Sequence, residues 1–287
     1  MLSQLFADPQ GMLRSLLIML PGYLLALSIH EAAHGWVAER CGDSTARYAG
    51  RITLNPLAHI DPLGFICMFV IGFGWAKPVP VNPLLYKNYR KDDLKVSMAG
   101  ICANLCLCIV CLLLITALLC VALEVTPEYD TWLDQQMNGN GEEVFIAGYH
   151  GEKCFFGPDG YAAFSGLFRG YYDYYVIESA LGRVGGIVYE MLLTCMYMNI
   201  ALAVFNLLPI PPLDGYHLLN DLILRRQLFA RHNVTRIAST VLVVLIVAGN
   251  YFPRFDILSI SIGWVRTNVA DGLYWLVRQF VSLIGII

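Results

Sequence analysis

The chain has 287 residues, of which 57% are hydrophobic and 14% are charged, and its formal net charge is −3. Soluble domains usually carry about a quarter of charged residues, so this composition excludes an ordinary soluble protein and predicts an integral membrane protein. A nearly neutral chain has no electrostatic reason to bind nucleic acid, so we expect a lipid bilayer and no nucleic acid among its partners.

The first apolar segment, residues 11–40, contains the sequence His30-Glu31-Ala32-Ala33-His34. Unpaired ionisable side chains are costly at membrane depth, so these residues are candidates for a functional site. Residues four apart lie on one face of a helix, and two histidines at that spacing can hold one zinc ion. Glu31 is rotated by about 100° from His30, so its carboxylate can reach a water on the metal rather than the metal itself.

The next apolar run, residues 64–75, is too short to cross a bilayer as a helix. Its flanks, GRITLNPLAHIDP and AKPVPVNP, are rich in proline, asparagine and β-branched residues, and they include strand-like segments at 50–56 and 77–83. We therefore predict a short membrane-associated β-hairpin or re-entrant segment. Such a segment is tolerated at membrane depth only where protein or a wet cavity covers it.

The later segments that are long and apolar enough to cross a membrane are 96–123, 184–208 and 237–252. The last stretch, 257–287, mixes charged and apolar residues, and it either spans the bilayer or lies in its interface. The sequence therefore predicts an all-α polytopic membrane protein. Its expected parts are a first half with the HEAAH helix and the re-entrant hairpin (1–123), an aromatic and acidic loop (124–183), a third core helix (184–225) and one or more C-terminal helices (226–287).

Basic residues are distributed unevenly between the predicted loops. Lysine and arginine gather in 40–95 and 209–236, whereas the 124–183 loop is mainly acidic. The positive-inside rule then places the first two regions in the cytoplasm and the acidic loop outside the cell membrane. We accordingly expect an extracytoplasmic N-terminus and a functional site towards the cytoplasmic side.

A catalytic zinc ion usually has three protein ligands, so one ligand must come from outside the HEAAH helix. The stronger candidate is Asp214, in NLLPIPPLDGYH, because the prolines before it open a helix at this point. His217 lies three residues further on, and spacing alone does not exclude it. For His59, His150 and His232 we expect the ordinary role of polar loop residues.

These residues resemble the site-2 protease family of intramembrane zinc metalloproteases, in particular its compact bacterial members without PDZ or nucleotide-sensing domains. The resemblance covers about residues 11–123 and 184–225. The motifs that carry it are HEAAH at 30–34, Gly100-x-x-x-Asn104, and Asn206-x-x-Pro209-x-Pro211-x-Leu213-Asp214-Gly215.

The resemblance implies a three-helix metalloprotease core with peripheral helices. It also implies that one catalytic zinc ion is held by His30, His34 and Asp214. Glu31 is then the catalytic acid and base. Asn206 is similar to a family asparagine that helps to hold the substrate backbone, and Asn104 is expected to line the same cavity.

The activity that the resemblance implies is hydrolysis of peptide bonds within or near transmembrane segments, in regulated intramembrane proteolysis. Two alternatives stand beside it. A catalytically silent relative that binds membrane proteins would have lost part of the site, whereas every expected residue is present here. A divalent-metal transporter would need polar ligands along several helices, and segment 96–123 offers few of them.

Overall fold

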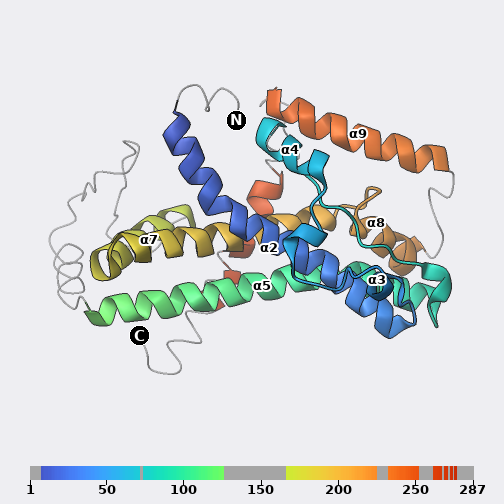
Figure 1. The fold of residues 1–287 in the computed structure, drawn as a ribbon, viewed down its shortest axis with the longest axis horizontal. Coiled ribbons are helices and arrows are strands. Elements are labelled where there is room, and N and C mark those ends of the chain that lie inside the picture. The colour runs from blue at the N-terminus through green and yellow to red at the C-terminus, as the bar shows by residue number, and fades with distance from the viewer. Residues whose placement is uncertain are drawn as a thin grey trace. The chain divides into compact units, whose positions relative to one another are not determined.

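The computed structural model describes residues 8–71, 74–125, 166–224, 232–251, 261–266, 268–270, 272–273 and 275–276. The chain forms two compact units, one of residues 1–109 and 194–266 and the other of residues 110–193 and 267–287. Every residue of the functional site belongs to the first unit. Helices dominate the described residues (Figure 1), which confirms the expected all-α fold. Most of the predicted 124–183 loop, with His150, lies outside them.

The principal elements, in chain order, are α2 (Pro9–Cys41), α3 (Thr45–Tyr48), η1 (Pro56–Ala58), α4 (Pro62–Ile71), η2 (Pro83–Leu85), α5 (Tyr89–Val125), α7 (Gly166–Asn206), α8 (Asp214–Leu218), η3 (Leu219–Leu224) and α9 (His232–Tyr251). Within α7, Gly182 has φ 70° and ψ −176°, so two helices meet there at a kink.

Three of the described helices are long and apolar enough to cross a membrane, over Pro9–Cys41, Tyr89–Ala122 and Ile177–Asn206. They correspond to the predicted segments 11–40, 96–123 and 184–208. The fourth predicted segment, 237–252, coincides with α9, and its passage through the membrane stays a prediction. The long helices confirm the expected polytopic character of the chain.

Helix α2 has a chemical signal at each end. The Asp8 carboxylate accepts the Gly11 N–H at 2.9 Å, which satisfies one of the free donors of the first turn. Gly42 ends the helix with φ 114°, a left-handed conformation that suits glycine. The N–H of Asp43 then returns to the Ala38 carbonyl at 3.0 Å. The chain therefore leaves the helix at Asp43.

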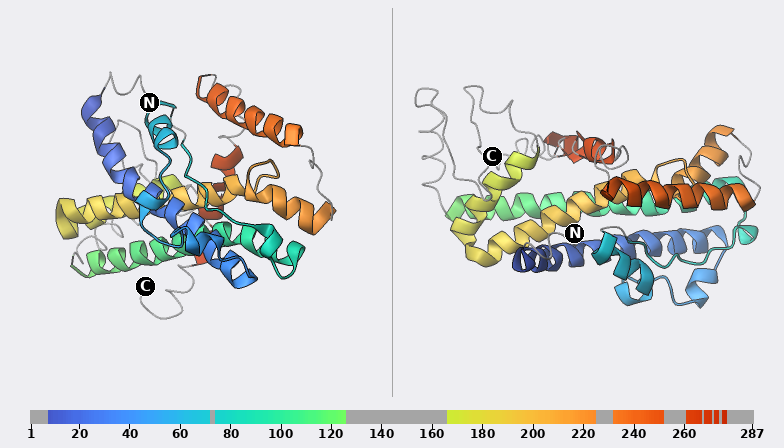
Figure 2. Two further views of the ribbon diagram at one scale, coloured as in Figure 1. Left: turned by 45° about the vertical axis from the view of Figure 1, so that its right-hand side comes forward. Right: turned by 90° about the horizontal axis from the view of Figure 1, so that it is seen from above.

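Glycines let three helices of the first unit approach closely. A Cβ added to Gly100 of α5 would lie 2.5 Å from His34 Nε2 on α2, and one added to Gly22 of α2 would lie 3.0 Å from Cys195 Cα on α7. Larger residues would push these helices apart. The core of the first unit is thus formed by α2, the first part of α5 and the end of α7 (Figure 2).

The connection between α2 and α5 differs from the predicted β-hairpin. A single antiparallel bridge joins Ile60 to Ala76, and α4 lies between them in the chain. The described residues of this connection contain no β-strand: 50–55 is irregular, with bends at Ile52 and Thr53, and leads into η1, and 77–82 is irregular chain without a ladder. The two strands were therefore wrongly predicted. Pro78 and Pro80 explain the second case, since they have no N–H to give to a partner strand.

Candidate metal centre

Helix α2 presents His30 and His34 one turn apart on the same face. Their Nε2 atoms are 3.0 Å apart, and the rings are nearly perpendicular at 82°. His30 is buried, with 5% of its surface exposed. Two imidazole nitrogens this close repel each other through their lone pairs unless a proton or a cation lies between them.

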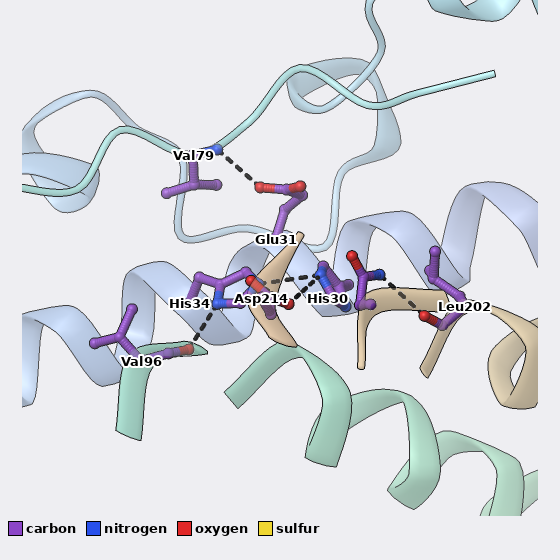
Figure 3. A network of polar contacts seen from close by, with 8 residues as sticks. His30, Glu31, His34, Val79, Val96, Leu202 and Asp214 are labelled. Carbon is purple, nitrogen blue, oxygen red and sulfur yellow. Dashed lines mark hydrogen bonds and ion pairs between the residues drawn. The ribbon is translucent and has the colours of Figure 1, made fainter. Parts of the chain in front are cut away.

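A third group reaches the histidines from the proline-rich turn after α7. Helix α8 begins at Asp214, after Leu213 in extended conformation. The Oδ2 atom of Asp214 lies 3.3 Å from His30 Nε2 and 3.4 Å from His34 Nε2 (Figure 3). Gly215 permits this start of the helix, because a Cβ there would lie 2.2 Å from the Leu207 carbonyl oxygen.

The three groups fit a zinc ion. Their ligand atoms all lie within 4.8 Å of one another. In a tetrahedral zinc site with bonds of about 2.0 Å, ligand atoms are about 3.3 Å apart, close to the separations found here. The Oδ2 atom of Asp214 is buried and accepts no hydrogen bond from the described residues, which is costly for a carboxylate oxygen unless a cation satisfies it. Two imidazoles and one carboxylate are also a donor set that suits zinc.

Helix α5 supports His34 from behind. His34 Nδ1 donates to the Val96 carbonyl at 2.7 Å, which fixes the ring and leaves the Nε2 lone pair directed at Asp214 and His30. Gly100, one turn further along α5, gives both imidazoles room. The Val96 contact was missed by sequence reasoning, because a backbone carbonyl has no residue signature.

Glu31 lies next to the candidate ligands but makes a different contact. Its Oε2 accepts the backbone N–H of Val79 at 2.8 Å. Figure 3 shows the Glu31 side chain directed at Val79, whereas the two histidines are directed at Asp214. Val79 belongs to the irregular chain between α4 and α5 and was not among the predicted site residues.

The two asparagines of the predicted substrate site are placed differently. Asn104 of α5 is fully buried, and neither atom of its amide group forms a hydrogen bond among the described residues. Asn206, at the end of α7, is half-buried and donates to the Leu202 carbonyl of its own helix at 3.0 Å. Their contact with substrate stays a prediction.

The alternative ligand His217 faces another partner. Its Nδ1 lies 3.0 Å from Oδ2 of the buried Asp93, and this hydrogen bond raises the pKa of His217. His217 is not part of the group formed by His30, His34 and Asp214. Sequence reasoning missed Asp93, which looks like one more charge in the polar run YRKDDLK.

His59 has a structural role. It is 1% exposed, its Nε2 bonds the Thr53 carbonyl at 2.9 Å, and its own carbonyl accepts the Lys77 N–H at 2.8 Å. It therefore ties together the two sides of the connection that contains α4. The side chain of His232 lies outside the described part of the structure.

The chain matches the family model described as Peptidase family M50 over residues 18–249. A Bacillus subtilis protein described as "Putative zinc metalloprotease YwhC" is 31% identical over 200 residues, which cover 70% of this chain and 66% of that protein. A Mycolicibacterium smegmatis protein described as "Putative zinc metalloprotease Rip2" is 31% identical over 101 residues, which cover 33% of this chain and 39% of that protein. The chain thus matches less than two thirds of the length of each of these relatives. No solved structure matches it.

Proposed function

Because the chain belongs to peptidase family M50, the family of site-2 proteases, we propose that it is an intramembrane zinc metalloendopeptidase of the site-2 type. It hydrolyses peptide bonds within or near transmembrane segments of other membrane proteins. The observation that carries this proposal is that Asp214 of α8 meets His30 and His34 beside Glu31, and that these last three residues lie on a helix long and apolar enough to cross a membrane.

The three ligands would hold one catalytic zinc ion, which when bound lowers the pKa of a water molecule and polarises the scissile carbonyl. Glu31 accepts a proton from the attacking water and then gives it to the leaving amine. Since Val79 binds its Oε2, the other carboxylate oxygen is the one that moves the proton. The Val96 carbonyl keeps the proton of His34 on Nδ1, so the Nε2 atom remains a ligand.

The partner that we propose is a transmembrane segment of another protein. A helical substrate has to unwind locally, because its carbonyls are otherwise bonded within the helix. An open apolar groove of about 370 Å³ beside the motif supports this proposal; its lining includes Ala32, Ala33, Trp36, Ile52, Leu54 and Ala103. Part of this lining comes from the helix that carries the HEAAH motif, and apolar side chains of a substrate would fit in the groove. Asn206 is proposed to help hold the substrate backbone, and Asn104 to line the same cavity.

We also propose that the protein lies in the cell membrane, with its N-terminus outside and its active site towards the cytoplasm. The support is the concentration of lysine and arginine in 40–95 and 209–236. The arrangement is tested by placing single cysteines at the N-terminus and in the 209–236 region and labelling intact cells with a reagent that does not cross the membrane. Labelling of the second position but not of the first would contradict it.

The function is tested with purified protein and a transmembrane reporter substrate. Glu31→Gln removes the base and keeps the ligands, so we expect cleavage to fall by about 100-fold to 10,000-fold while zinc stays bound. The matched control is Glu39→Gln, a change to another glutamate of α2, which pairs with Arg47. The proposal fails if Glu31→Gln cleaves at the wild-type rate.

A further inference from the structure

The Glu31 carboxylate is held by irregular backbone, residues 77–82, which we name the Val79 segment. Val79 is buried, with 7% of its surface exposed, whereas the residues on either side of it are exposed. Pro78 and Pro80 carry no N–H, so Val79 supplies the one backbone donor at the centre of the segment. That donor bonds Glu31 Oε2 at 2.8 Å.

The Val79 side chain lies against the helix that carries Glu31. A Cβ added to Gly35 would lie 3.2 Å from Val79 Cγ1 and 2.9 Å from the Cβ of Ala46. Helix α2 therefore has no side chain at Gly35, where the Val79 segment crosses it. The absence of a side chain lets the backbone of the segment come within hydrogen-bonding distance of Glu31, one turn earlier on the helix.

Arg51 fixes the beginning of the Val79 segment. Its Nη2 donates to the Lys77 carbonyl at 2.6 Å. The backbone N–H of Lys77 in turn donates to the His59 carbonyl at 2.8 Å. The arginine is 9% exposed. Burial of a guanidinium is costly, and this hydrogen bond offsets part of the cost. Both backbone polar groups of Lys77 are thus occupied.

Asp43 fixes the end of the Val79 segment. Its carboxylate is fully buried; Oδ2 accepts the Asn82 N–H at 2.5 Å, and Oδ1 accepts the Thr45 N–H at 2.9 Å. Burial raises the pKa of Asp43, but these hydrogen bonds lower it below its ordinary value, so the carboxylate is ionised at neutral pH. Asp43 lies two residues after the end of α2, and its N–H bonds the Ala38 carbonyl of that helix. The anchor for the segment that binds Glu31 is therefore itself fixed to the helix that carries Glu31.

We infer that Asp43 and Arg51 are positioning residues for Glu31. They hold the Val79 segment at its two ends, and its central N–H fixes one oxygen of the Glu31 carboxylate. The other oxygen is thereby presented in one orientation for proton transfer. The catalytic part of this inference rests on the proposed function, whereas the contact itself can be measured without substrate.

Hydrogen–deuterium exchange of the full chain in detergent tests the contact. Glu31→Ala removes the acceptor and Asp43→Asn releases the segment, so each should speed exchange of the Val79 amide by about tenfold or more. The control is Asp61→Asn, because Asp61 also accepts two backbone N–H groups but at the start of α4. Unchanged exchange in both Glu31→Ala and Asp43→Asn overturns the inference.

A matched pair of proline substitutions tests the catalytic role. Val79→Pro deletes the donor to Glu31, and Val81→Pro deletes an N–H that bonds no group among the described residues. We expect Val79→Pro to lower kcat by about tenfold to 100-fold, with KM within about twofold and zinc content unchanged, and Val81→Pro to resemble wild type. Wild-type kcat in Val79→Pro, with Glu31→Gln inactive, overturns the inference and leaves the proposed function standing. If wild type itself cleaves nothing, the proposed function fails, and with it the catalytic role.

Discussion

The metal centre and the Val79 segment lie on either side of Glu31, and they are built in different ways. The metal centre consists of side chains on two helices, and close helix packing at Gly100 sets the position of the histidines. The Val79 segment is irregular backbone that is held by a few hydrogen bonds. The comparison suggests that metal binding depends on the helix core, whereas the orientation of the base depends on a loop.

The two regions should therefore fail differently when they are changed. Damage to the metal centre should remove zinc and activity together. Damage to the Val79 segment should lower the rate of cleavage and leave zinc in place.

The largest effect is expected from Asp214→Ala. This change removes one of the three proposed ligands, so zinc affinity should fall by more than about 100-fold and cleavage should be lost. His217→Ala is the matched change three residues away, and it should keep its zinc, because His217 pairs with Asp93 instead. Metal analysis of both variants would contradict the ligand assignment if His217→Ala lost zinc and Asp214→Ala did not.

Gly100→Ala should have the next largest effect. Its Cβ would lie 2.5 Å from His30 Cε1 and from His34 Nε2, so the histidines have to move or the helices have to separate. We expect a loss of about 1–3 kcal/mol in stability and at least about tenfold in zinc affinity. Gly263→Ala is the control, since a Cβ there meets no atom within 4 Å. Unchanged zinc affinity in Gly100→Ala would show that the packing at this point is looser than described.

Arg51→Met should have a smaller and more selective effect. It frees the Lys77 carbonyl from its donor, so we expect kcat to fall by about threefold to tenfold while zinc content stays at the wild-type value. Arg47→Met is the control, because Arg47 is exposed and pairs with Glu39. Equal kcat values in the two variants would show that Arg51 does not position Glu31.

The smallest effect concerns pH and the pair of His217 with Asp93. Asp93 raises the pKa of His217 above 6.5, so the pair stabilises the fold below that pH and loses this effect as pH rises through the folded-state pKa. Because His217 is exposed, the advantage of wild type over His217→Gln should be no more than about 1 kcal/mol. Thermal unfolding from about pH 5.5 to about pH 9 measures it. A difference that does not change with pH would contradict the assignment.

The helices and the candidate ligands could be predicted from sequence because their signals are local or chemically unusual. Apolar length predicted α2, α5 and α7, and the i, i+4 histidines predicted one face of α2. Asp214 stood out because prolines precede it. The structure brings it to the two histidines, as the predicted ligand set requires.

The environment of Glu31 could not be predicted in the same way. β-branched residues and asparagine suggested strands at 50–56 and 77–83. The first segment contains bends instead, and the prolines of the second prevent it from forming a hydrogen-bonded ladder. The contacts of Val79, Val96 and Asp43 use backbone groups, which every residue has. The single N–H between two prolines at 78–80 is a pattern that could have indicated such a contact, but it was read as part of a strand.

The central claim is that His30, His34 and Asp214 together hold one zinc ion. X-ray absorption at the zinc edge of the purified protein tests it most directly, with Asp214→Ala measured beside it. We predict one zinc ion per chain, with nitrogen and oxygen ligands at about 2.0–2.2 Å, and loss of most zinc in the variant. Sulfur ligands at about 2.3 Å, or a variant with the same spectrum and zinc content as wild type, would contradict the account.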